Sequence, residues 1–196
     1  MGRELNDVLK AYLKERLSKK RFTHSMNVAD MARELAPIYG ADPERAYFAG
    51  MTHDIAKELP KDKQLALAKK CTLGVSRIEL ASPPLLHAPA GAQLLKESFG
   101  VEDEDILLAI RYHTVAAADM SPLAQAVYLA DLTSADRDYK DVKKMRRYAH
   151  VSAEKGMFEA LRFSVEDLTE KGSTIPLCTI EAYNEYAEYF RDNKKN

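Results

Sequence analysis

Apolar side chains recur at three- and four-residue intervals along most of the chain, which is the period of an α-helix. The first clear example runs through Leu5, Leu9, Leu13 and Leu17, which share one helix face and predict a helix that ends near Ser18. No stretch of alternating apolar and polar residues stands between hairpin turns. The pattern therefore predicts an all-α protein with negligible sheet content.

Capping residues mark where several of these helices begin and end. Asp42 precedes Pro43 and Ser121 precedes Pro122, so each pair is typical of an N-cap followed by proline at the first helical position. Gly40 can supply a left-handed C-cap for the helix before it. The helices predicted from periodicity and caps cover about 5–18, 20–37, 43–54, 61–70, 89–99, 102–113, 122–131, 152–172 and 179–192.

Length, charge and cysteine content narrow the class of protein. A chain of 196 residues fits one domain, and the proline-dense segment 81–89 is too short for an interdomain linker. The net charge of -1 gives no global field that would attract nucleic acid or an anionic membrane. The two cysteines, Cys71 and Cys178, suggest neither a disulfide framework nor a thiolate zinc site. No segment is apolar enough to span a bilayer, so we expect a cytoplasmic protein.

Several histidines and aspartates stand where helices are predicted to end. His53 and Asp54 are adjacent near the end of the third helix, and both can reach one metal only where that helix stops or bends. His87 and His113 lie at a helix entrance and a helix exit. Asp131 follows the apolar run AVYLA, where an unpaired carboxylate would be costly. Imidazole and carboxylate together suit iron, manganese, zinc or cobalt. Spacing alone leaves a metal site and ordinary structural histidines about equally well supported.

The ordered series of these residues resembles the HD-domain superfamily of metal-dependent phosphohydrolases, whose signature is a His, a His-Asp doublet and a later Asp on a helical bundle. The matching residues are His24, His53, Asp54, His87, His113 and Asp131. The strings LLHAPAGAQLL, EDEDILLAIRYHT and YLADLTSADRDYKDVKKMRRYA are also similar to the bacterial YqeK family, described as symmetrical diadenosine tetraphosphate hydrolases. This similarity extends from about Leu5 to Phe190.

The resemblance implies a fold, a cofactor and a reaction. The fold is a single HD-type helical bundle over residues 1–196, with a metal-binding core of about 20–135 and C-terminal helices of about 141–192 packed on it. The cofactor is a pair of divalent transition metal ions, iron first, with manganese, cobalt or zinc as alternatives. A hydroxide activated by the metals would attack the polyphosphate bridge of diadenosine tetraphosphate and give two molecules of ADP.

The same resemblance assigns metal ligands. It implies that one metal is held by His24, His53, Asp54 and Asp131. It also implies that Asp54 bridges to a second metal held by His87 and His113.

Phosphate contacts are expected beside these ligands. Lys57 follows Asp54 by three residues and could neutralise charge on phosphoryl oxygens, so Asp54 and Lys57 are the candidate catalytic residues. Arg137, in SADRDY, matches an arginine of the family and offers the bidentate geometry that phosphates favour. The remaining candidate substrate contacts are Arg21, Thr114 and Tyr139.

Two segments depart from the pattern of the family. After His113 the usual glycine-containing loop is replaced by Thr-Val-Ala-Ala-Ala-Asp-Met, and Ser-Ala-Asp stands where Glu-Pro usually precedes Arg137. Losing glycine stiffens a loop and denies the backbone close approach to a ligand. The nucleotide pocket is therefore where this chain is expected to differ.

Two other functions stay open. An enzyme with the same fold and metals could hydrolyse a nucleotide mono-, tri- or cyclic phosphate, and a nonhydrolytic module could bind nucleotide or RNA through the basic run 143–147. A charge run is more often a solvated helix face, and His150 beside it is interpreted as an ordinary surface histidine. The expected partner is a small nucleotide, with no membrane and no nucleic acid, and a homodimer is compatible with the sequence.

Overall fold

The computed structural model describes residues 3–193, and every regular element in that range is a helix. The helices are α1 (Arg3–Arg16), α2 (Lys19–Tyr39), α3 (Pro43–Thr52), α4 (Lys61–Lys70), α5 (Arg77–Leu80), α6 (His87–Phe99), α7 (Glu104–Tyr112), α8 (Pro122–Thr133), α9 (Val142–Ala149), α10 (Ala153–Glu170) and α11 (Leu177–Asn193). The prediction of an all-α protein is confirmed. Across this part of the chain, none of the helices combines the length and the apolar content that crossing a bilayer requires.

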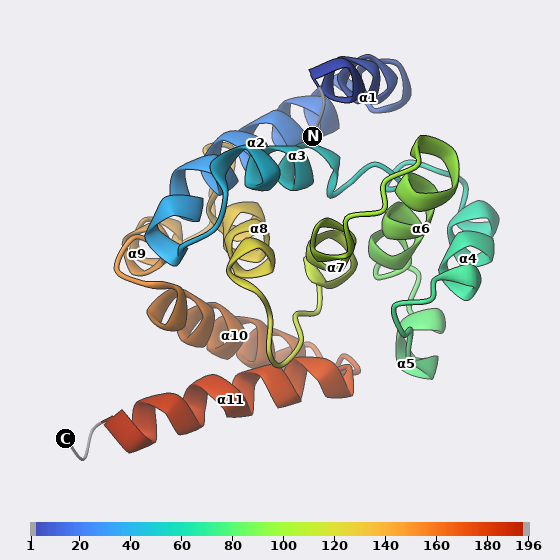
Figure 1. Ribbon diagram of the computed structural model, residues 1–196. Coiled ribbons are helices and arrows are strands. Elements are labelled where there is room, and N and C mark those ends of the chain that lie inside the picture. Colours follow the sequence, from blue (N-terminus) through green and yellow to red (C-terminus); the bar gives the residue numbers. More distant parts are fainter. Residues whose placement is uncertain (1–2, 194–196) are drawn as a thin grey trace.

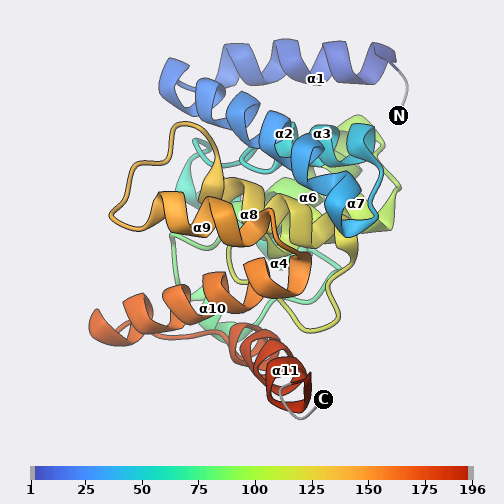
Figure 2. The same ribbon diagram turned by 90° about the vertical axis from the view of Figure 1, so that its left-hand side faces the viewer.

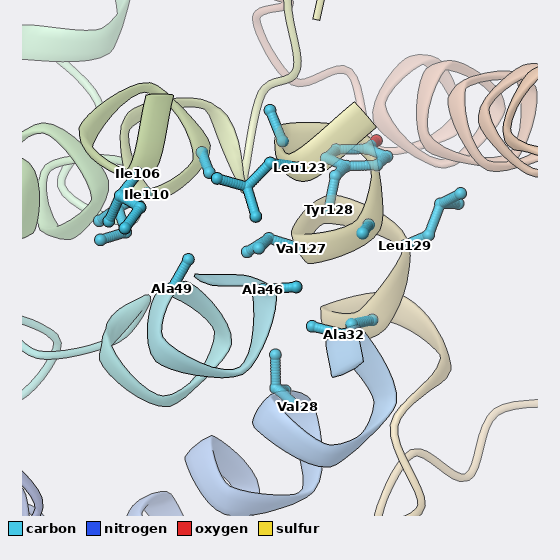
Figure 3. Close-up of a cluster of buried hydrophobic side chains, with 14 of the residues drawn as sticks. Val28, Ala32, Ala46, Ala49, Ile106, Ile110, Leu123, Val127, Tyr128 and Leu129 are labelled. Carbon is cyan, nitrogen blue, oxygen red and sulfur yellow. The ribbon is translucent and has the colours of Figure 1, made fainter. Parts of the chain in front are cut away.

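The helix α8 lies at the centre of the bundle and contacts α2, α3, α7, α9 and α10. Its apolar side chains meet those of α2, α3 and α7 in the core, where Val127 of α8 lies among Val28, Ala49 and Ile110 (Figure 3). Burial on most sides explains why α8 is apolar nearly throughout its length. The packing fixes the C-terminal end of α8, which carries Asp131, beside α2 and α3.

The remaining helices extend this core in two directions. In Figure 1, α7, α6 and α4 follow one another away from α8, and α6 packs against both α7 and α4. The helix α10 packs against α8 and α9, and α11 packs against α10. Figure 2 shows α1 and α11 at opposite ends of the molecule.

Two helix boundaries and one additional short helix differ from the prediction for identifiable reasons. The helix α2 continues through Pro37 to Tyr39, because the residue that ends it is Gly40, at φ 82°. The helix α6 begins at His87, so Pro89 lies in its first turn, where a missing N–H needs no partner. The short helix α5 was not predicted, although Ser76 and Glu79 form a capping box at its start.

Close packing of α2 on α3 depends on Gly50. A Cβ atom at this position would lie 2.9 Å from both the Ala29 Cα and the Val28 carbonyl oxygen, which are backbone atoms of α2. Backbone cannot move aside as a flexible side chain can, so the two helices would have to separate. Because Gly50 is three residues before His53, this contact also sets the position of the histidine at the end of α3.

We expect Gly50→Ala to lower the free energy of unfolding by about 1–2 kcal/mol, because a clash with backbone atoms places the overpacking cost in the upper part of its range of about 1–3 kcal/mol, and the gain in helix propensity offsets only roughly 1 kcal/mol of it. Urea denaturation measures this change. Gly91→Ala is the matched comparison, because its Cβ would meet the Ile55 Cγ2 methyl at 3.3 Å, and that side chain can shift. A loss in Gly91→Ala as large as that in Gly50→Ala would contradict the role given to the α2 backbone.

Candidate metal centre

His53 and Asp54 lie at the point where α3 ends. His53 is the C-cap residue of that helix, and the chain then continues in turns through residue 58. Both side chains are buried, with His53 fully enclosed and Asp54 exposed to 2%. The ending of the helix is what allows adjacent residues to face one centre, as the sequence predicted.

Three of the histidines share one arrangement of the imidazole ring. The Nδ1 atom of each lies within hydrogen-bonding distance of the carbonyl oxygen three residues earlier: His53 to Gly50 at 2.7 Å, His87 to Pro84 at 2.8 Å and His113 to Ile110 at 2.7 Å. A carbonyl only accepts, so Nδ1 carries a proton, and in the neutral form of each ring Nε2 presents a lone pair. These contacts therefore orient three nitrogen atoms that could each bind a cation.

The three Nε2 atoms converge on the two carboxylate oxygens of Asp54. Asp54 Oδ2 lies 3.4 Å from His53 Nε2, whereas Oδ1 lies 3.3 Å from His87 Nε2 and 3.8 Å from His113 Nε2. The last two nitrogens are 3.1 Å apart. Each oxygen of Asp54 thus faces a different part of the cluster, which is the placement that a bridging carboxylate needs.

His24 and Asp131 complete the cluster from α2 and α8. His24 Nε2 lies 2.9 Å from Asp131 Oδ1, and the same oxygen lies 3.8 Å from His53 Nε2. The His24 and His53 ring centres are 5.3 Å apart, and those of His53 and His113 are 4.9 Å apart. The structure therefore brings together all six residues that the resemblance singled out.

The charges in the cluster depend on one another. Burial opposes ionisation of Asp54, but the charge of His53 and its hydrogen bond to Asp54 outweigh burial and hold the pKa of Asp54 well below its usual range, while Asp54 raises the pKa of His53 despite burial. Burial, reinforced by His53, lowers the pKa of His113 to about 4. Burial, reinforced by His113, also takes the pKa of His87 well below its ordinary value. His87 and His113 are therefore neutral at pH 7, which is the form that binds metals.

The donor atoms fit divalent metal ions. His53 Nε2 is buried without a hydrogen-bond partner, an expensive arrangement unless a cation receives its lone pair. Donor atoms lie within 4.8 Å of one another in two groups, His24 with His53 and Asp131, and His53 with Asp54 and His113. Here His53 belongs to both groups, whereas the resemblance gives the shared role to Asp54.

Three cationic side chains surround these donors. Arg21 Nη1 donates to Asp54 Oδ2 at 2.6 Å, and Arg137 donates through Nε to the Asp131 carbonyl at 2.6 Å and through Nη2 to its carboxylate. Lys57 Nζ lies 3.1 Å from His87 Nε2 and 4.0 Å from Asp54 Oδ1. Burial lowers the pKa of Lys57, although the Asp54 charge opposes this shift.

The other two candidate substrate contacts, Tyr139 and Thr114, have surroundings unlike those of the three cationic side chains. The Tyr139 ring stacks on Phe163 of α10 at 5.3 Å, and its hydroxyl donates to the Leu132 carbonyl. The Thr114 hydroxyl, beside His113, is buried without a hydrogen-bond partner. Tyr139 therefore packs toward the C-terminal helices, whereas Thr114 keeps an uncommitted hydroxyl next to a proposed ligand.

A cavity of about 230 Å³ adjoins His24 at the edge of the cluster. Its lining includes the basic residues Lys20, Arg21 and Arg137 together with Glu58 and Asp136. A second hollow of about 480 Å³ shares Lys20 and Asp136 with it. An anionic, extended ligand would therefore meet cationic side chains on its way to the metal centre.

Two residues near the centre make contacts that the sequence did not predict. Asp136 Oδ2 lies 2.8 Å from His24 Nδ1. Arg146, placed in the basic run of α9, donates to the carbonyl oxygens of Thr133 at 2.8 Å, Ser134 at 2.7 Å and Arg137 at 3.0 Å. Arg146 therefore ties α9 to the segment that carries Asp131 and Arg137, and it is not a freely solvated charge.

His150 lies apart from the centre. Its Nε2 pairs with Glu34 at 2.8 Å, and its Nδ1 contacts the Arg146 carbonyl at 2.7 Å. These contacts agree with its interpretation as an ordinary surface histidine.

The chain matches a known domain family and is similar to named bacterial proteins. The family model described as HD domain matches residues 21–136. The chain is 34% identical over 173 residues to a symmetrical bis(5'-nucleosyl)-tetraphosphatase of Halalkalibacterium halodurans, covering 88% of this chain and 92% of that protein. It is 32% identical over 174 residues to the protein of the same name from Bacillus subtilis, covering 89% and 93%.

A solved structure supports the same assignment. It is a predicted HD superfamily hydrolase involved in NAD metabolism from Clostridium acetobutylicum, 34% identical in sequence with a TM-score of 0.88. The alignment covers 93% of this chain and 97% of that one. The chain therefore belongs to the HD-domain family of helical metal-dependent phosphohydrolases.

Proposed function

We propose that this protein hydrolyses diadenosine tetraphosphate symmetrically to two molecules of ADP. The observation that carries the proposal is the convergence of four imidazoles and two carboxylates on one centre beside a basic cavity. The bacterial relatives named symmetrical bis(5'-nucleosyl)-tetraphosphatase support the choice of substrate, since they match nearly nine tenths of this chain.

The proposed cofactor is a pair of divalent transition metal ions, with iron as the first choice and manganese, cobalt or zinc as alternatives. Their proposed ligands are His24, His53, Asp54, His87, His113 and Asp131. When bound, such ions act as Lewis acids and make water a nucleophile near neutral pH. Asp54 is the proposed bridge, because its two oxygens face different histidines.

The protein side chains would position and stabilise the polyphosphate. The water oxygen joins one of the two central phosphorus atoms, the bond from that phosphorus to the bridging oxygen breaks, and this oxygen leaves with the second ADP. The water protons pass to the departing phosphate and to solvent. Arg21 and Arg137 supply guanidinium groups at the entrance, and Lys57 places an ammonium near Asp54 to offset charge that develops on phosphoryl oxygens. Thr114 and Tyr139 stay as predicted substrate contacts.

Product analysis tests the substrate and separates the two hydrolytic alternatives. Metal-loaded protein should convert diadenosine tetraphosphate into two equivalents of ADP, without ATP or AMP, as measured by anion-exchange chromatography. Turnover of a nucleotide mono-, tri- or cyclic phosphate with no ADP from diadenosine tetraphosphate would instead support the other HD phosphohydrolase. Metal analysis of anaerobically purified protein tests the proposal of iron.

The proposed setting is the cytoplasm, where nucleotides of this kind are available. We also propose that residues 20–135 form the metal-binding core, since the HD-domain match covers nearly the same span, and that the helices of 141–192 pack on it. The six proposed ligands all come from one chain, so a homodimer stays a prediction that the proposed activity does not require.

A further inference from the structure

Four histidines face the metal centre, but His24 differs from the others in how its ring is held. His53 and His113 follow the last residues of α3 and α7, where backbone carbonyls lack helical partners and can accept from Nδ1. His87 uses the carbonyl of Pro84, in the turn before α6. His24 lies inside α2, where the carbonyl three residues earlier already accepts a helical hydrogen bond. A side chain must therefore supply the acceptor.

That acceptor is Asp136, in the segment between α8 and α9. Its Oδ2 lies 2.8 Å from His24 Nδ1. Its Oδ1 accepts hydrogen bonds from Asn27 Nδ2 at 3.0 Å and from the Ser134 hydroxyl at 2.9 Å. Asn27 stands one turn after His24 on the same helix. The carboxylate is therefore held from both sides with one oxygen directed at the imidazole.

We propose that Asp136 is the positioning residue that fixes the His24 ring for metal binding, an inference that rests on the proposed metal centre. With the proton held on Nδ1 by Asp136, Nε2 presents its lone pair toward Asp131, whose Oδ1 is 2.9 Å away. The opposite tautomer would direct an N–H at Asp131 and remove the nitrogen ligand. A carboxylate partner also makes the imidazole a stronger base than a carbonyl partner does.

Two substitutions at Asp136 distinguish the effect of losing the hydrogen-bond acceptor from the effect of changing the size of the side chain. In Asp136→Asn the amide can donate to His24 Nδ1, which favours the wrong tautomer while the side-chain shape is kept; loss of the correct tautomer is known to disable a histidine whose geometry is intact. In Asp136→Ala no acceptor is left in any orientation. Titration of the metal-free protein with cobalt(II), followed by its visible absorption, should show affinity for the site that includes His24 reduced about 10–100-fold in both variants.

Asp138→Asn is the matched control. Asp138 lies two residues after Asp136 and is exposed, and the substitution removes the same charge. It should bind cobalt(II) as the wild type does. The melting temperature of metal-free Asp136→Asn should stay close to that of the wild type, because the other tautomer of His24 can donate from Nε2 to Asp131. The proposal would be overturned if both Asp136 variants bound cobalt(II) as tightly as the wild type. It would also be overturned if Asp138→Asn lost as much cobalt(II) affinity as they do.

The same titration separates this inference from the proposed function. If the wild-type protein binds cobalt(II) and the Asp136 variants bind it more weakly, the role of Asp136 stands even where no diadenosine tetraphosphate is hydrolysed. A wild-type protein that binds no cobalt(II) would refute the role of Asp136 and the metal centre together.

Discussion

Asp54→Asn is expected to reduce the hydrolysis of diadenosine tetraphosphate by about 10³-fold or more and to remove most of the bound metal. The two oxygens of Asp54 face His53 on one side and His87 with His113 on the other. An amide presents a single neutral oxygen, so it cannot serve both sides or balance the charge of two cations. Metal content by elemental analysis and ADP release by chromatography measure the two effects.

The comparison variant is Asp62→Asn, which changes the same chemical group at an exposed position in the first turn of α4. It should keep the wild-type metal content and turnover. Circular dichroism of metal-free Asp54→Asn should show intact helices, because asparagine has the shape of aspartate and its oxygen can still accept from Arg21. Wild-type metal content and turnover in Asp54→Asn would refute the bridging role.

Much of the helical framework could be predicted because its signals are local. Asp42, Ser121 and Ser152 were expected to begin helices, and their side chains accept from the backbone N–H groups of Arg45, Ala124 and Lys155. A cap contacts the first turn of its own helix, so a few consecutive residues are enough to predict where the helix begins. The helix α5 escaped prediction because four residues are too few to show a hydrophobic period, even with its capping box.

The hydrogen-bond partners of the proposed metal ligands could not be predicted in this way. His24 and Asp136 are 112 residues apart, and their contact exists only because α2 packs on α8. Arg146 likewise looks like one of several solvated cations in the sequence, and only the fold directs it at three carbonyl groups. The sequence therefore indicated the types of ligand, whereas tertiary packing decides how each ligand is held.

The segment after His113 shows how a departure from the pattern is accommodated. Ala116 and Asp119 adopt φ angles of 57° and 55°, a region that glycine occupies without strain. Ala116 is fully buried, and the Asp119 N–H donates to Glu185 of α11 at 2.8 Å. Packing and this hydrogen bond thus hold a glycine-like turn without glycine.

Arg111→Met is expected to lower the free energy of unfolding by about 3–5 kcal/mol, the range for breaking a buried ion pair. Arg111 and Glu79 are exposed to only 1% each, and Arg111 Nη2 lies 2.7 Å from Glu79 Oε1. Arg111 also donates twice to the Gly74 carbonyl, at 2.9 and 2.6 Å. Removing the guanidinium leaves the buried Glu79 carboxylate without its cationic partner and the Gly74 carbonyl without the two donors of Arg111.

A double-mutant cycle with Glu79→Gln isolates the charge from the packing. Glu79 Oε2 accepts from the Ser76 N–H at 2.9 Å, and glutamine can keep that capping contact while removing the negative charge. In the Glu79→Gln background, Arg111→Met should therefore cost less than it does alone, by at least about 1 kcal/mol. Equal costs in both backgrounds, from urea denaturation of the four proteins, would show that the charges do not interact.

The ion pair also connects stability to the proposed metal centre. Arg111 lies on α7, two residues before His113, and Glu79 lies on α5, in the segment that leads to His87. The pair therefore joins the two chain segments whose histidine Nε2 atoms lie 3.1 Å apart. Arg111→Met should weaken cobalt(II) binding measurably under conditions where the protein is still folded. Unchanged metal affinity in folded Arg111→Met would mean that α6 and α7 hold His87 and His113 in place without this ion pair.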